Sequence, residues 1–118
     1  FEAVQRRLTR LFSERSGLTG LVVHNEAAVG HVLTVIRSTN RSVPREISVV
    51  AICPDEVAER CTPQLDSVVI PAEQVGSHAV ELLMRKIEGQ EVPEATLLPP
   101  RLTARASTAP ARATVTSL

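Results

Sequence analysis

Three adjacent polar residues, His24, Asn25 and Glu26, come directly after the short apolar run at 21–23. An imidazole, an amide and a carboxylate in succession offer hydrogen-bond donors and acceptors to a small polar molecule. His24 and Glu26 are also the residue types of an acid/base pair. The surrounding sequence, however, supplies no nucleophile, oxyanion-binding turn or metal-ligand set. We therefore expect a binding site here, with no cofactor and no enzymatic activity.

Each of these residues also has a purely structural interpretation. Asn25 is a good N-cap for a helix that begins at Glu26, either alone or while also contacting a ligand. Glu26 would lie in the first turn of that helix, where the helix dipole favours a carboxylate. His24 is either a strand-end histidine with local partners or a ligand donor or acceptor. The sequence leaves these alternatives open.

A second group of polar residues follows the apolar stretch 47–52. Cys53 there is either a small core residue or a ligand contact or redox sensor. Asp55 and Glu56 either cap a short helical turn or face a ligand. Parallel strands bring their carboxyl ends to one edge of a sheet, and ligands of open α/β sheets bind at that edge. The candidate ligand-binding residues are therefore His24, Asn25, Glu26, Cys53 and Asp55.

The spacing of apolar residues predicts the elements that position these groups. Short β-branched runs predict strands, and apolar residues that recur every three or four positions predict helices. The alternation of the two indicates an α/β fold with a parallel sheet and right-handed crossovers. The expected strands are 19–23, 47–52, 65–70 and 101–106, and the expected helices are 2–15, 26–39 and 72–88, with one helical turn at 56–60.

Two of these elements carry apolar faces that need a partner. Residues 101–106 alternate polar and apolar, which predicts a half-buried strand with Leu102, Ala104 and Ala106 on its buried side. The helix at 72–88 has an apolar stripe at helical spacing. Its inward residues are expected to be Val75, Ala79, Leu82, Leu83 and Ile87.

The composition of the 118 residues excludes several classes of function. Phe1 and Phe12 are the only aromatic residues, which argues against stacking platforms for single-stranded nucleic acid. Thirteen basic residues balance thirteen acidic ones, so no overall field attracts DNA or an anionic membrane. The chain contains neither a membrane-spanning apolar run nor a signal-peptide pattern, so we expect a cytoplasmic protein. Cys53 and Cys61 are then expected to be reduced thiols rather than a disulfide.

Several sequence features occur together in order. VVHNEAAVGHVL at 22–33 is followed by VPREISVVAI at 43–52, CTPQLDSVVIP at 61–71 and LLPPRLTARAST at 97–108. Over residues 1–110 the chain resembles the C-terminal part of the effector-binding core of bacterial LacI/GalR-family transcriptional regulators. The Val-Pro ahead of ISVV, the Thr-Pro-Gln-Leu ahead of SVVIP and the LPPRL segment are its most specific parts.

The resemblance implies a periplasmic-binding-protein-like fold, in which two α/β lobes close over a small molecule, often a sugar or nucleobase. Residues 1–106 would form the C-terminal effector-binding lobe, with a parallel sheet in three layers. Residues 71–98 would normally pack on the first lobe, which is absent here. Residues 107–118 would be a flexible tail. Operator DNA would be bound only through an N-terminal helix-turn-helix that this chain does not contain.

The site residues carry over from the family with two departures. Family members usually have Asn-Asp where this chain has His24 and Asn25, and the matched Asp often contacts the effector. The family's next strand commonly ends in Gly-Phe/Tyr-Asp, whereas this chain has Ala-Ile-Cys at 51–53. Both departures remove a carboxylate suited to sugar hydroxyls. The sequence therefore indicates where an effector would bind without naming it.

The resemblance also implies a homodimer. Without the first lobe, the helix at 72–88 would lose the sheet it packs on, and exposing each inward side chain costs about 1.5–3 kcal/mol. We expect residues 71–98 to find another apolar partner, either by swapping with a second copy or by folding back on this chain. For Cys61, core and interface positions remain open. The expected interface residues are Val29, Val32, Leu33, Arg60 and Cys61.

Three hypotheses of function follow. The leading one is the effector-binding and dimerising portion of a transcriptional regulator that senses a sugar or another metabolite. The second is a stand-alone small-molecule-binding or interaction module without DNA-binding output, because the chain has no DNA-binding segment. The third, an enzyme on a flavodoxin-like sheet, has little support in the sequence.

Overall fold

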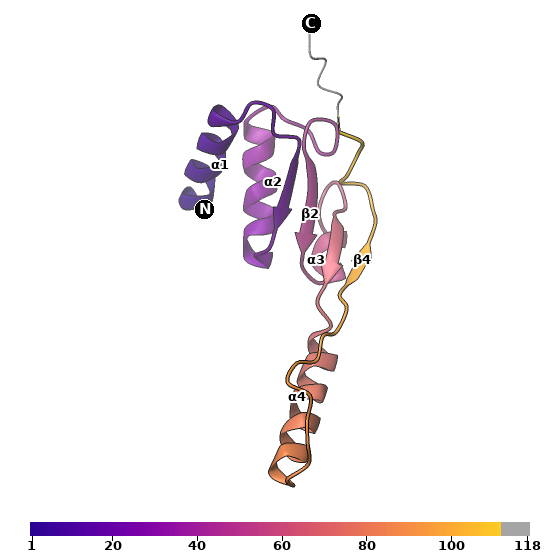
Figure 1. Ribbon diagram of the computed structural model, residues 1–118. Coiled ribbons are helices and arrows are strands. Elements are labelled where there is room, and N and C mark those ends of the chain that lie inside the picture. The colour runs from indigo at the N-terminus through magenta and orange to yellow at the C-terminus, as the bar shows by residue number, and fades with distance from the viewer. Residues whose placement is uncertain (112–118) are drawn as a thin grey trace, which may run out of the picture.

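The computed structural model describes residues 1–111, which form a lobe and a projecting arm (Figure 1). We call residues 1–70 and 101–111 the lobe and residues 71–100 the arm. All four strands belong to the lobe. In chain order the elements are α1 (Glu2–Glu14), β1 (Gly20–Val23), the short 3-10 helix η1 (Glu26–Ala28), α2 (Val29–Ser38), β2 (Ser48–Ile52), α3 (Asp55–Glu59), β3 (Asp66–Val69), α4 (Ala72–Ile87) and β4 (Arg101–Thr103).

The four strands form one sheet in the order β1-β2-β3-β4. β1, β2 and β3 are parallel, with Val22 opposite Val50 and Val50 opposite Asp66. β4 is antiparallel to β3, with Leu102 opposite Val68. The parallel strands expected at 19–23 and 47–52 are therefore confirmed, and they are neighbours in the sheet.

The core lies between one face of this sheet and the helices α1, α2 and α3. Side chains alternate along a strand, so Val23, Val49 and Ala51 share a face. All three are buried in one cluster with Phe12 of α1 and Ala58 of α3. Right-handed crossovers that all step in one direction across a sheet place their helices on the same face. The sequential order of β1, β2 and β3 thus explains why α2 and α3 lie on the same face.

The opposite face of the sheet carries no helix in the described part of the chain. Val22, Val50, Val68 and Leu102 share this face by their register. The side chain of Leu102 is 67% exposed. The α/β class and the predominantly parallel sheet are confirmed, but residues 1–111 form two layers rather than the expected three.

The strand β4 is confirmed, whereas its expected buried side is wrong. Leu102, Ala104 and Ala106 are exposed, and Thr103 and Arg105 are the residues that turn inward. The guanidinium of Arg105 has polar partners inside the lobe, and the face toward which Leu102 points is uncovered. Polar contacts therefore set the orientation of this strand, against its apolar pattern.

The segment after β4 is anchored at its start. Ser107 is fully buried, and its hydroxyl donates to the Val49 carbonyl and accepts from the Asp66 N–H at 2.7 Å. The N–H of Val49 donates to the Ser107 carbonyl at 2.8 Å. The segment after β4 therefore lies beside the first part of β2, ahead of the point at which β3 begins to pair with β2. The prediction of a flexible tail that starts at residue 107 is wrong for that first residue. Residues 112–118 lie outside the part of the chain that the structure describes.

The arm projects away from the lobe on two chain crossings (Figure 1). The molecule measures 64 × 37 × 25 Å, with a radius of gyration of 19.1 Å. A compact chain of this length would have a radius of gyration of about 13–14 Å. Residues 71–98 remain outside the core of the lobe, so the expected folding back on this chain is limited to the segment that returns along α4. A swap with a second copy stays a prediction.

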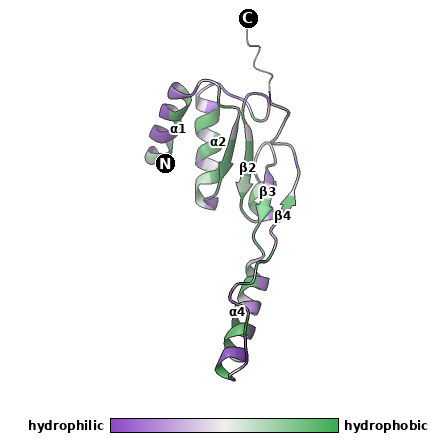
Figure 2. Cartoon of the chain, in the orientation of Figure 1, coloured by the Kyte–Doolittle hydropathy of each residue, from purple (hydrophilic) through white to green (hydrophobic). Residues whose placement is uncertain are grey.

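The apolar stripe of α4 is visible along the arm in Figure 2. No residue of α4 is buried, although 16 residues form the helix. The returning segment lies against it and leaves an apolar groove, whose walls include Val75, Leu82 and Leu98. Of the residues expected to face inward, Leu82 is half-buried, whereas Val75, Ala79, Leu83 and Ile87 are exposed.

The buried hydroxyl of Ser107 is expected to stabilise the lobe measurably. In Ser107→Ala the Val49 carbonyl and the Asp66 N–H lose a buried partner, which should reduce the free energy of unfolding by about 1–3 kcal/mol. Urea denaturation followed by circular dichroism measures this change. Ser13→Ala, at an exposed hydroxyl bonded to the Arg10 carbonyl, should change it by less than about 0.5 kcal/mol. Equal effects would show that Ser107 does not anchor the segment.

Candidate functional site

A hollow of about 330 Å³ lies at the carboxyl ends of β1, β2 and β3. These ends point toward the arm, and the chain passes the hollow as it leaves β3 for α4 (Figure 1). Exposed polar side chains from the end of β1 meet apolar side chains of β2 and β3 there. The lining residues are His24, Glu26, Ile52, Cys53, Pro54, Val69, Ile70 and Ala72.

The junction between β1 and α2 has the structure that its residue types predict. The Asn25 side-chain oxygen accepts a hydrogen bond from the Ala27 N–H at 3.0 Å and so caps η1. His24 and Glu26, on either side of it, line the hollow with exposed side chains. The cap interpretation of Asn25 is confirmed, and contacts of all three residues with an effector stay predictions.

Cys53 is a buried residue of the core cluster, as one of its two expected roles requires, and it also lines the hollow, where contact with an effector stays a prediction. Burial, followed by the nearby Cys61 and Glu26, raises the pKa of its thiol. Burial also raises the pKa of Cys61, whose thiol donates to the Val57 carbonyl at 3.3 Å. Both cysteines are free, as expected. Cys53 therefore presents a neutral thiol to the hollow at pH 7.

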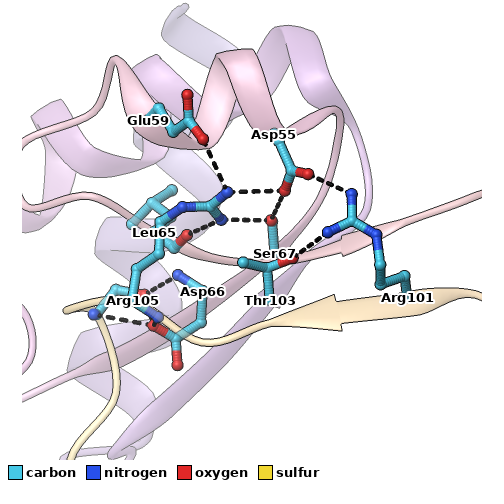
Figure 3. Close-up of polar contacts among 9 residues, drawn as sticks. Asp55, Glu59, Leu65, Asp66, Ser67, Arg101, Thr103 and Arg105 are labelled. Carbon is cyan, nitrogen blue, oxygen red and sulfur yellow. Dashed lines mark hydrogen bonds and ion pairs between the residues drawn. The ribbon is translucent and has the colours of Figure 1, made fainter.

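Asp55 lies beside the hollow without lining it, which corrects its expected position as a wall of the site. As the first residue of α3, it directs its carboxylate toward β3 and β4 (Figure 3). Oδ1 accepts from Arg105 at 2.7 Å and from Ser67 at 3.0 Å, and Oδ2 accepts from Arg101. Hydrogen bonds from Arg105 and then from Arg101 hold the pKa of Asp55 well below its ordinary value.

Arg105 is the central cation of this network (Figure 3). Its side chain is 9% exposed, and its Nη1 donates to the Leu65 carbonyl at 2.9 Å and to the Ser67 hydroxyl at 2.6 Å. Its Nη2 reaches Asp55 and, at 3.4 Å, Glu59. Our sequence reasoning missed this residue. Its only sequence signal is a lone arginine among small residues in LTARAST.

Asp66 is a second buried carboxylate that the sequence analysis did not identify. Burial raises its pKa, but hydrogen bonds from the Thr108 hydroxyl and from the N–H groups of Arg105 and Ser107 outweigh burial. The pKa of Asp66 is therefore lower than its ordinary value. The ionised carboxylate fixes the segment after β4 to the start of β3.

Three of the expected dimer-interface residues lie in the core instead. Val29, Val32 and Leu33 are buried on the inner side of α2 within a single copy of the chain, so they cannot also face a partner. Their spacing along α2 is the helical spacing of a face that packs on the sheet. Cys61 is half-buried against the core, and Arg60 is exposed.

The described residues set limits on other kinds of site. No group of three or more His, Cys, Asp or Glu side chains within residues 1–111 is placed to hold a metal ion. None of the helices in that range has the length and apolarity of a membrane span. The hollow offers hydrogen-bonding groups at its rim and apolar side chains at its floor, which suits a small molecule with both kinds of surface.

A sheet of this topology, with a hollow at its carboxyl edge, is characteristic of periplasmic-binding-protein lobes. Residues 2–108 match the family described as a periplasmic binding protein-like domain, and the chain belongs to that family. Within it, the chain is an effector-binding domain of the LacI family of transcription regulators, as its relatives establish.

Among these relatives, the lactose operon repressor of Rhizobium radiobacter is 32% identical over 87 residues, covering 74% of this chain and 76% of the relative. A LacI-family regulator from Arthrobacter sp. FB24, solved in complex with lactose, is 28% identical with a TM-score of 0.73. It is matched over 92% of this chain and 41% of its own.

A LacI-family regulator from Bifidobacterium animalis subsp. lactis has the same fold, with a TM-score of 0.84 at 24% identity. That match covers 93% of this chain. The chain spans 41% of the length of this solved structure, as it does of the Arthrobacter one.

The network around Asp55 predicts an acid-sensitive stability. Because the pKa of Asp55 is lower in the folded chain than in the unfolded chain, its contribution is complete above about pH 5. It is lost as the pH falls below about 4, where the unfolded chain binds the proton first. Urea midpoints at pH 7, 4 and 3 should therefore fall less steeply for Asp55→Asn than for the wild type.

The matched control is Glu56→Gln, which removes an exposed carboxylate from the next position of α3. Its urea midpoints should fall with pH as steeply as those of the wild type. An acid response of Asp55→Asn that equals that of Glu56→Gln would refute the lowered pKa of Asp55.

Proposed function

We propose that the hollow at the carboxyl edge binds a small-molecule effector of a transcription regulator. The observation that carries this proposal is the meeting of His24, Glu26 and Cys53, from two neighbouring strand ends, with the start of the arm. The volume of about 330 Å³ is that of a small-metabolite site. The lactose bound by the Arthrobacter relative supports a sugar or another polar metabolite as the effector.

The output of this site is control of DNA binding in the parent protein. The effector changes the arrangement of this domain, and a helix-turn-helix domain joined on its N-terminal side binds or releases operator DNA. The operon repressor among the relatives supports this assignment. Such a protein acts in the cytoplasm, where its DNA is, and performs no catalytic step.

We also propose that the chain forms a homodimer through the arm. The α4 residues Val75, Leu83 and Ile87 are exposed, so the arm offers apolar side chains to a partner. The first turn of α4 contains Glu73 and its last turn contains basic residues, among them Arg85. Two copies packed antiparallel would bring these opposite charges together across a symmetric interface.

The free energy that such a dimer gains from apolar burial must exceed the free energy that association costs. Burying half of the exposed apolar side chains of α4 from both copies contributes about 8–12 kcal/mol. Association costs about 4–15 kcal/mol in lost translational and rotational freedom. With the largest gain and the smallest cost, the net free energy of association is about −8 kcal/mol, so a micromolar dissociation constant is the tightest that we expect.

Effector binding is tested by calorimetry with lactose and a panel of small sugars and nucleosides. For a compound that binds the wild type, Glu26→Ala and His24→Ala should each weaken binding by about tenfold or more, because each removes a hydrogen bond at the rim of the hollow. Glu88→Ala, at the far end of the arm, should leave affinity unchanged. Equal losses in all three variants, or no binding by any compound, would contradict the proposal.

Dimer formation is tested by sedimentation velocity on the whole chain. Ile87→Thr should raise the dissociation constant by about tenfold or more, because two buried side chains are lost for each dimer. Val22→Thr is the matched control, since Val22 on the bare sheet face is 71% exposed and Ile87 is 70% exposed. A monomeric wild type at about 100 μM, or equal effects of both variants, would refute the arm as the interface.

A further inference from the structure

The hollow at the carboxyl edge is lined by one carboxylate and by no basic side chain of arginine or lysine. Glu26 supplies that carboxylate, from the position after the cap residue Asn25. Within residues 1–111 the Glu26 side chain has no cation or hydrogen-bond donor as a partner. It is nevertheless close enough to Cys53 for its charge to raise the pKa of that thiol. An unpaired negative charge therefore stands at the rim of the hollow.

The arginines beside the hollow do not neutralise this charge. Arg101 and Arg105 pair with the carboxylates of Asp55 and Glu59 (Figure 3). Two guanidiniums and two carboxylates in mutual contact carry no net charge together. The charge that a ligand meets in the hollow is therefore that of Glu26.

Most of the lining is apolar. Five of the eight lining residues have apolar side chains, namely Ile52, Pro54, Val69, Ile70 and Ala72. The side chain of Ile70 is 54% exposed, although it is large and aliphatic. A molecule with hydroxyl groups on every edge would leave several of them without partners against this wall, which is unfavourable once water is excluded. A ligand with an apolar body would instead cover Ile70 and extend a polar group to the rim.

We propose that the hollow selects a small organic cation, an amine whose ammonium group donates to Glu26 and whose apolar body packs on Ile52 and Ile70. This inference rests on the proposed function, and it adds the charge and the surface that the effector must have. A charged donor forms a stronger hydrogen bond with a carboxylate than a neutral hydroxyl does. An anion would be repelled by Glu26, and the Ala27 N–H at the start of η1 is already taken by Asn25.

The proposal is tested with three compounds that share one apolar body and differ in charge: benzylamine, benzyl alcohol and benzoate. Isotope-labelled whole chain is titrated with each and followed by NMR at about pH 7, where the amine is protonated and benzoate is ionised. Benzylamine should shift the amide signals of residues 24–26, 52–54 and 69–72. Its dissociation constant should be about fivefold or more below that of benzyl alcohol. Benzoate should leave these signals unchanged up to about 10 mM.

Three variants separate the contribution of charge from that of the apolar wall. In Glu26→Gln the affinities for benzylamine and benzyl alcohol should agree within about twofold, because the charge is lost and the size is kept. Glu56→Gln is the matched control, since this exposed carboxylate of α3 does not line the hollow, and it should retain the preference for benzylamine. Ile70→Ala should weaken both compounds by a similar factor and leave their ratio unchanged.

Several results would overturn the selection of a cation. These are equal affinities of benzylamine and benzyl alcohol for the wild type, a preference that survives in Glu26→Gln, or the absence of benzylamine shifts in the hollow. Lactose that binds more tightly than benzylamine would assign the hollow to neutral sugars and would also overturn it.

The effector site itself is decided separately. If benzyl alcohol or lactose shifts the signals of the hollow and benzylamine has no advantage, the selection of a cation fails and the binding site remains. If neither the sugars and nucleosides in calorimetry nor these three compounds bind, both the effector site and its selectivity are removed.

Discussion

The buried guanidinium of Arg105 is the constraint on which the carboxyl half of the lobe depends. An arginine that is removed from water must have its donors satisfied, because an unpaired buried charge is very costly. Its partners come from the loop before β3, from β3 itself and from α3, through Leu65, Ser67 and Asp55. These three elements therefore keep fixed positions relative to β4. The same contacts fix the position of the wall of the hollow at Cys53.

The same constraint decides which surface stays apolar. Because Thr103 and Arg105 turn inward, Leu102 points outward and joins Val22 on a sheet face that no described helix covers. The arm adds a second apolar surface along α4. The described residues thus bury one core in the lobe and leave two apolar faces exposed, and the projection of the arm makes the molecule elongated.

Local patterns in the sequence were sufficient for the elements and for the parallel pairing of β1 with β2, but not for the antiparallel direction of β4. The change from a strand period to a helical period at residue 25 located both the β1–α2 junction and the hollow's rim. The orientation of β4 could not be predicted in this way, because it depends on contacts such as that between Arg105 and Asp66, which are 39 residues apart. Periodicity also cannot distinguish a core stripe from an interface stripe, which explains the misplaced Val29.

The walls of the hollow belong to the lobe and to the arm, which two chain crossings connect. His24 and Cys53 move with the sheet, whereas Ala72 is the first residue of α4 and moves with the arm. A ligand that touches both walls has a different affinity for each orientation of the arm. It can shift the arm only by the free energy of that difference, however tightly it binds. Contacts with residues 70–72, rather than the strength of binding to the rim, therefore determine whether an occupant of the hollow can change the shape of this domain.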